Sequence, residues 1–153
     1  MGRLQNRIPP PILASLVAVG MGALAWFSEA RWGTPALRLG LTFVLAVLGG
    51  LFGVPAFAAF RSAGTTIDPV HIERASQLVT TGIYAITRNP MYVSLTLLIL
   101  AWGVYLGVLA ALLGPLAFAV FVTVFQILPE ERALTARFGA AYDTYRARVR
   151  RWL

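Results

Sequence analysis

The sequence predicts an all-α integral membrane protein, with four transmembrane helices and a C-terminal amphipathic helix on the cytoplasmic side. Of its 153 residues, 58% are hydrophobic and only 12% are charged, whereas a soluble domain carries about 25% charged residues. One uncharged stretch runs from Met91 to Leu128, which is too long for one span and sufficient for two. The length suits a single membrane domain over residues 1–153.

Composition also narrows the classes of function. All thirteen basic residues are arginines, and the net charge is +7. The arginines cluster at the predicted membrane borders rather than on a soluble module, which favours the bilayer and its anionic headgroups over nucleic acid as a partner. The chain has no cysteine, which excludes a disulfide framework, a thiol nucleophile and a cysteine-based metal site. We expect no metal.

The first two predicted spans cover about residues 10–28 and 38–60. No small-residue cleavage site follows the first, so we expect a retained span rather than a removed signal peptide. A polar loop over residues 61–89 then leads to the uncharged stretch, where two break points compete. A break at Gly103–Gly107 gives spans over 90–106 and 108–128, whereas one at Gly114–Pro115 leaves a second helix too short to cross. We favour the first.

Residues 130–152 have the pattern of an amphipathic helix. Their apolar side chains recur every three or four positions: Leu134, Phe138, Tyr142, Tyr145, Val149 and Trp152. Arginines mostly occupy the other side, which is typical of a helix on a membrane surface. Gly139 is a candidate break in this helix.

The arginines also predict the orientation. With four spans, the N-terminus, the loop over 61–89 and the C-terminal helix share one side, which carries eleven of the thirteen arginines. The positive-inside rule then places both termini in the cytoplasm. We expect the membrane to be a bacterial inner membrane. The two ends of the third and fourth spans return to the same border, so Arg88 and the pair Glu130–Glu131 are predicted neighbours in space.

This border holds the best candidate site. Asn89 is a favoured N-cap and Pro90 a favoured first helical residue, and a helix N-terminus beside an arginine suits an anionic group. We therefore expect a charged cofactor to bind here. Arg88 offers a planar donor fork to a carboxylate, while Glu130 or Glu131 suits an amine or ribose hydroxyls.

The walls of this pocket are expected to include Tyr84 and Tyr92. Gln126 precedes Glu130 by four residues, on the same helical face, so its amide is expected just inside the membrane, below the acid. Simpler roles fit some of these residues, since interfacial tyrosines form aromatic belts. His71, the single histidine, is interpreted as a solvated loop residue.

Two motifs carry a resemblance to a known superfamily. Thr-Thr-Gly-Ile-Tyr and Arg-Asn-Pro-Met-Tyr lie within residues 80–92, and Glu130–Glu131 is followed by Phe138–Gly139 and spaced tyrosines. Together they resemble the isoprenylcysteine carboxyl methyltransferase and phospholipid methyltransferase superfamily, over about residues 57–153. The resemblance implies S-adenosyl-L-methionine as cofactor, bound at the cytoplasmic helix ends. It also implies a lipid or lipophilic small molecule as methyl acceptor.

The same resemblance implies roles for particular residues. Its cofactor positions are Tyr84, Arg88, Asn89, Pro90, Tyr92, Glu130 and Glu131, to which Gln126 is added by its helical position. The implied catalytic residues are Arg88, Glu131 and Arg146, with Arg146 and Arg150 near the substrate mouth. One departure is Asn89, where the prenylcysteine and phospholipid enzymes usually carry histidine, so that histidine's acid–base roles do not transfer.

Two other functions stay open at this stage. Membrane sterol and steroid reductases resemble the superfamily in their C-terminal halves and use NADPH, although the predicted pocket offers few basic residues for an extra phosphate. A non-catalytic membrane scaffold would not require Arg88 and the glutamate pair to converge.

Overall fold

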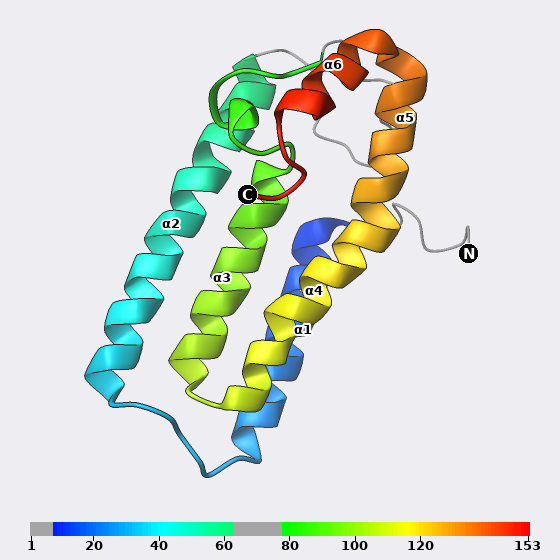
Figure 1. The fold of residues 1–153 in the computed structure, drawn as a ribbon. Coiled ribbons are helices and arrows are strands. Elements are labelled where there is room, and N and C mark those ends of the chain that lie inside the picture. The colour runs from blue at the N-terminus through cyan, green and yellow to red at the C-terminus, as the bar shows by residue number, and fades with distance from the viewer. Residues whose placement is uncertain (1–7, 63–77) are drawn as a thin grey trace.

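The structure is a computed structural model that describes residues 8–62 and 78–153. Most of this part is helical (Figure 1). Its helices are α1 (Pro10–Trp26), α2 (Pro35–Ser62), α3 (Pro90–Leu106), α4 (Leu113–Val122), α5 (Leu128–Phe138) and α6 (Ala140–Arg148). Its shorter turns are the 3₁₀ turns η2 (Gly82–Ala85) and η3 (Leu109–Leu112) and the π turn η4 (Thr123–Ile127), which joins α4 to α5.

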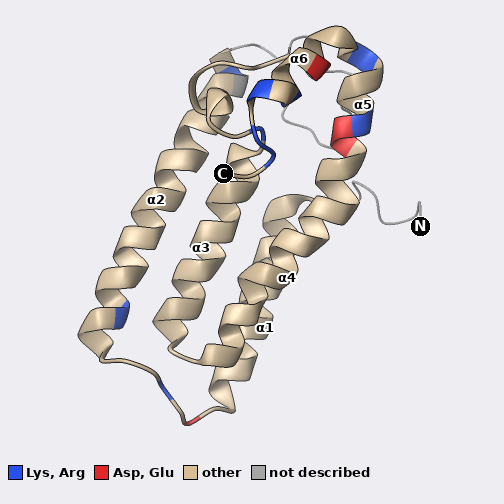
Figure 2. Ribbon diagram, in the orientation of Figure 1, with Lys and Arg blue, Asp and Glu red and all other residues tan. Residues whose placement is uncertain are grey.

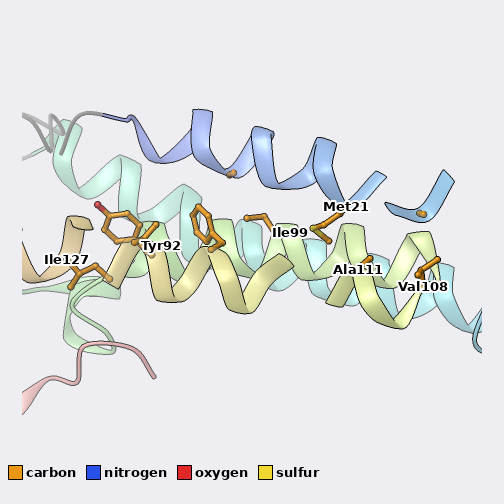
Figure 3. Packing of buried hydrophobic residues seen from close by; sticks show 10 residues of the cluster. Met21, Tyr92, Ile99, Val108, Ala111 and Ile127 are labelled. Atoms are coloured by element: carbon orange, nitrogen blue, oxygen red, sulfur yellow. The ribbon is translucent and has the colours of Figure 1, made fainter. Parts of the chain in front are cut away.

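The central helix of the bundle is α3. It packs against α2 on one side and against α1 and α4 on the other (Figure 1). The contact with α2 is close because Gly49 and Gly53 face α3, and a Cβ at Gly53 would lie 2.5 Å from Ser94 Oγ. Small residues permit such an approach between membrane helices. A buried apolar cluster that includes Met21 and Ile99 runs along α1, α3 and α4 (Figure 3).

Within residues 8–62 and 78–153, two helical stretches are long and apolar enough to cross a bilayer: Pro35–Ala59, with 25 residues, and Leu109–Phe138, with 30. The apolar helices α1 and α3 have 17 residues each. At 1.5 Å per residue each is about 26 Å long, against a hydrocarbon core of about 30 Å. The predicted all-helical membrane fold is confirmed to this extent, while the four-span topology stays a prediction. Residues 63–77 of the predicted loop, with His71, lie outside the described residues.

The turn after α3 falls where the sequence predicts a break. α3 ends at Leu106, and Gly107 follows with φ of 71°, a left-handed conformation that favours glycine. The Gly107 carbonyl accepts a hydrogen bond from Trp32 N at 2.9 Å, and the Arg38 guanidinium packs where a Cβ would stand. The loop between α1 and α2 is thereby tied to this turn.

The helix that follows extends past its predicted end at Pro129. It continues through α5 because the π turn shifts the main-chain hydrogen bonds immediately before the proline, with Leu128 N donating to the Thr123 carbonyl. Proline lacks an N–H, and it is tolerated where the regular hydrogen-bond pattern is already interrupted. The helical stretch therefore continues beyond the predicted span for the length of α5, and both glutamates lie on this extension.

The single helix predicted over 130–152 is corrected to two helices. Gly139 has φ of 51°, which a residue with a Cβ rarely adopts, and it separates α5 from α6. α6 ends at Arg148, and Val149 is extended. The chain therefore turns back over the bundle, and its C-terminus lies near the start of α3 (Figure 1).

Charged residues gather at the end of the bundle that carries α5, α6 and the C-terminus (Figure 2). The opposite end carries Glu29, Arg31 and Arg38. Between the two ends the helices are uncharged, so the charges form two borders of unequal size.

Candidate functional site

Three segments meet at the more charged border. They are the stretch from η2 into α3, the junction of η4 with α5, and α6 with the residues after it. The first two meet because α3 and the α4–α5 stretch form an antiparallel hairpin, whose two ends return to one border. The third joins them because Gly139 reverses the chain.

The predicted proximity of Arg88 to the glutamate pair is confirmed. Arg88 Nη1 lies 2.9 Å from Glu131 Oε1, and the two side chains are only 11% and 15% exposed. Arg88 Nη1 also donates to the Tyr142 hydroxyl at 3.0 Å. Arg88 Nε is buried without a partner among the described residues, so one donor of this guanidinium is left for a further acceptor.

A second arginine, Arg151, holds the same carboxylate. Its Nε donates to Glu131 Oε1 at 2.9 Å and its Nη2 donates to Glu131 Oε2 at 2.8 Å. The hydrogen bond with Glu131 raises the pKa of Arg151 above its usual value. Glu131 thus sits between two guanidinium groups, an arrangement of charge-assisted hydrogen bonds stronger than neutral ones.

The neighbouring glutamate has a different partner. The Tyr92 hydroxyl donates to Glu130 Oε1 at 2.6 Å, and Tyr92 is buried at the start of α3. A contact of this length is typical of an O–H donor on a carboxylate. Glu130 therefore contacts α3, whereas Glu131 contacts Arg88 and Arg151.

Two tyrosines link η2 to α6. Tyr84 is buried, and its main-chain carbonyl accepts a hydrogen bond from the Tyr145 hydroxyl at 2.7 Å. Burial raises the pKa of both Tyr84 and Tyr145 above the usual tyrosine value, as it does for Tyr142. These phenols therefore stay protonated at neutral pH, and the Tyr145 hydroxyl is a donor while the Tyr142 hydroxyl accepts from Arg88.

Asn89 and Pro90 are both buried at the start of α3. Pro90 opens the helix, as predicted. The Asn89 side chain makes no capping hydrogen bond to that helix, which corrects its interpretation as a side-chain cap. Its Nδ2 donates to the Arg151 carbonyl at 2.9 Å, which fixes the orientation of the amide, whereas a cap would need its Oδ1 to accept from a helix N–H.

Gln126 and Arg146 lie at the edges of the site. Gln126 is buried in the π turn and donates from Nε2 to the Ile8 carbonyl at 2.7 Å, so its amide is turned toward the residues before α1. Arg146 is half-exposed and pairs with Asp143 at 3.1 Å. With Glu131, Arg146 borders an open hollow of about 500 Å³. The residues that line this hollow are Leu128, Glu131, Arg132, Thr135, Ala136 and Arg146.

The sequence interpretation did not assign Arg151 or Thr87 to the site. Thr87 is fully buried, and its Oγ1 donates to the Arg151 carbonyl at 3.2 Å. Arg151 was grouped with the other arginines of the C-terminal helix, and nothing in its spacing separates it from them. Tyr142 and Tyr145 belonged to the second motif but had no role. Among the described residues, no group of three histidine, cysteine, aspartate or glutamate side chains suits a metal ion.

The described residues combine apolar helices with a charged, partly buried cluster at one border, which is typical of a helical membrane protein. Residues 37–141 match the model of the phospholipid methyltransferase family. The chain therefore belongs to that family, which implies a membrane methyltransferase that acts on a lipid-type substrate.

One relative is an uncharacterized protein of Haemophilus influenzae. It is 46% identical to this chain over 63 residues, which are 41% of this chain and 100% of that protein. No solved structure matches the chain.

Proposed function

We propose that the protein transfers a methyl group from S-adenosyl-L-methionine to a lipid or other apolar acceptor at the cytoplasmic face of the membrane. The observation that carries this proposal is the contact of Arg88 with Glu131 at 2.9 Å. It joins the two sequence motifs of the methyltransferase resemblance, since Arg88 belongs to the first and Glu131 to the second. Neither a scaffold nor the length of the hairpin requires that contact.

The residues of the site fit the chemistry of this cofactor. A sulfonium cofactor with an amino-acid end and a ribose presents a carboxylate, an amine and hydroxyls. The free Nε donor of Arg88 is buried and suits the carboxylate. Glu130 and Glu131 are acceptors for the amine or the hydroxyls, and Tyr84 and Tyr92 supply aromatic surface beside them.

The cofactor supplies an electrophilic methyl group, and the protein has little covalent chemistry to add. The side chains of Arg88, Glu130 and Glu131 hold and orient the donor. The apolar helices exclude water from the reacting atoms, which strengthens the interactions of charges there. On this proposal the acceptor arrives from the bilayer, and the hollow beside Arg146 is where its polar end lies.

The proposed orientation follows from the charges. The border with the site carries most of the described arginines (Figure 2), and such a border faces the cytoplasm by the positive-inside rule. We propose a bacterial inner membrane protein with one membrane domain over residues 1–153 and both termini in the cytoplasm.

Isothermal titration of the detergent-purified protein tests the cofactor. We expect micromolar binding of S-adenosylhomocysteine and none of NADPH. Binding of NADPH alone would support a membrane reductase, and a folded protein that binds neither ligand would support a scaffold.

Variants at the site sharpen this test. Arg88→Ala removes a charged hydrogen-bond donor worth about 1.5–3 kcal/mol, so the Kd for S-adenosylhomocysteine should rise roughly tenfold to a hundredfold. The matched control is Arg148→Gln, at an exposed arginine of α6, which should leave the Kd unchanged. Equal Kd values for Arg88→Ala and the wild type would refute the assignment of Arg88.

A further inference from the structure

The last five residues of the chain, 149–153, form a segment that we call the C-terminal tail. Val149 is extended, with φ of −117° and ψ of 130°. Thr87 and Arg150 then form an isolated parallel β-bridge, in which Arg88 N donates to the Arg150 carbonyl at 2.9 Å. The tail therefore pairs through its main chain with the residues that lead into α3.

The next carbonyl of the tail is a second anchor. The Arg151 carbonyl accepts hydrogen bonds from Thr87 Oγ1 at 3.2 Å and from Asn89 Nδ2 at 2.9 Å. Thr87 is 0% exposed and Asn89 is 9% exposed, and buried polar groups that lose a partner are costly. The residues on both sides of Arg88 are thus fixed by the tail.

The side chain of Arg151 acts on the other half of the site. Its two donors contact the two oxygens of Glu131 at 2.9 and 2.8 Å. A planar guanidinium that binds a carboxylate at two points fixes the plane of that carboxylate as well as its position. Glu131 Oε1 is the oxygen that also contacts Arg88, so the orientation of Glu131 determines where it meets the Arg88 guanidinium.

We propose that Arg151 is a positioning residue of the candidate site. Through its side chain it sets the orientation of the Glu131 carboxylate, and through its carbonyl it holds the main chain around Arg88. The family match ends at residue 141, so this part of the site lies in residues that follow the matched stretch. The effect of Arg151 on cofactor binding rests on the proposed function, whereas its effect on the main chain around Arg88 does not.

The test compares three full-length variants with the wild type, and a fourth, Arg151→Ala, is used for chemical rescue. Arg151→Gln removes the two-point contact, and Arg151→Lys keeps the charge but not the planar fork. Arg150→Gln is the matched control, because its main chain forms the bridge while its side chain is exposed. Arg151→Lys also serves if Arg151→Gln fails to fold.

Hydrogen exchange, measured without cofactor, is the first readout. In the peptide that spans residues 84–92, the amide of Arg88 should exchange at least about tenfold faster in Arg151→Gln than in the wild type, since a weakened tail opens more often. Arg150→Gln should exchange at the wild-type rate. Unchanged exchange in both Arg151 variants, or equally faster exchange in Arg150→Gln, would overturn the proposal.

Binding of S-adenosylhomocysteine is the second readout. Arg151→Gln should weaken it roughly tenfold to a hundredfold, and Arg151→Lys by less. Ethylguanidinium added to Arg151→Ala should restore part of the affinity, which a purely structural role of the tail would not produce. If the wild type binds no S-adenosylhomocysteine, the proposed function fails and the exchange data alone decide the positioning role. If the wild type binds but Arg151→Gln binds equally well, the positioning role fails.

Discussion

Replacing Glu131 with glutamine should destabilise the protein more than replacing either arginine that contacts it. The carboxylate lies between the guanidinium groups of Arg88 and Arg151. A neutral amide there leaves two cations facing each other, with Arg88 only 11% exposed. Removing one partner of a buried ion pair costs about 3–5 kcal/mol. Since Arg151 is 36% exposed and can turn into water, we expect the lower end, about 3 kcal/mol.

Replacing Arg88 with methionine should have a smaller effect. The carboxylate then keeps its two-point contact with Arg151, so no buried charge loses its last partner. The losses are the Arg88 hydrogen bonds to Glu131 and to the Tyr142 hydroxyl, and we expect their sum to stay below the about 3 kcal/mol of Glu131→Gln. Combining Arg88→Met with Glu131→Gln removes both charges of this buried pair, so the double variant should be less destabilised than the sum of the two single variants.

Unfolding by sodium dodecyl sulfate in mixed micelles, followed by tryptophan fluorescence, measures these differences. The expected order of destabilisation is Glu131→Gln above Arg88→Met, with a double variant below the sum. If Glu131→Gln is no more destabilising than Arg88→Met, the carboxylate does not hold the two guanidinium groups together and the reasoning fails.

Three further predictions concern other parts of the structure. Tyr92→Phe loses the 2.6 Å hydrogen bond to Glu130 and should lower the free energy of unfolding by about 1.5–3 kcal/mol in the same assay. Gly107→Ala should lower the melting temperature, because φ is 71° and Arg38 fills the space of a Cβ. The third prediction concerns pH. Burial raises the pKa of Tyr145 in the folded state. The contribution of Tyr145 to the free energy of unfolding is therefore fully present below its unfolded-state pKa of about 10 and is lost as the pH rises through its folded-state pKa. Tyr145→Phe should flatten this decline in free energy of unfolding, measured from pH 8 to 11.

Each of these has a control at a similar residue. Gly40→Ala lies in α2 with nothing within 4 Å of its added Cβ, so it should not lower the melting temperature. Tyr105→Phe changes an exposed tyrosine and should leave the free energy of unfolding as in the wild type. A Gly107→Ala protein as stable as Gly40→Ala, or a Tyr145→Phe protein with the wild-type decline, would contradict the corresponding prediction.

The parts of the site that the sequence predicts are those fixed by helix length. A break near Gly107 follows from the length that a membrane helix needs. Once that break is made, the two ends of the hairpin must return to one border. The return of Arg88 and Glu131 to the same border is therefore a consequence of local pattern and topology, whereas the direct contact of their side chains at 2.9 Å is shown by the structure.

The role of Arg151 depends on several steps, of which the sequence indicates the break at Gly139 but not the path of the chain after it. A glycine in the left-handed region at Gly139 turns α6 back, the helix must end at Arg148, and the tail must then pair with Thr87. Because the apolar side chains keep a helical spacing throughout residues 130–152, the hydrophobic pattern alone predicts one helix there. The π turn around Gln126 is likewise invisible to a pattern count, since it adds one residue to a turn without changing composition.

Asn89 connects these observations to the choice of acceptor. Its amide is neutral at every physiological pH and donates to the Arg151 carbonyl, so it holds the tail and takes no proton. In the proposed reaction, an acceptor that is already anionic needs no base, and its charge and that of a sulfonium disappear together as the methyl group moves. Exclusion of water favours such a loss of opposite charges. An amine acceptor must lose a proton, and among the described residues near Arg88 the two carboxylates, Glu130 and Glu131, are both already engaged. We therefore expect lipophilic carboxylates and thiolates to be better acceptors than lipophilic amines of matched chain length.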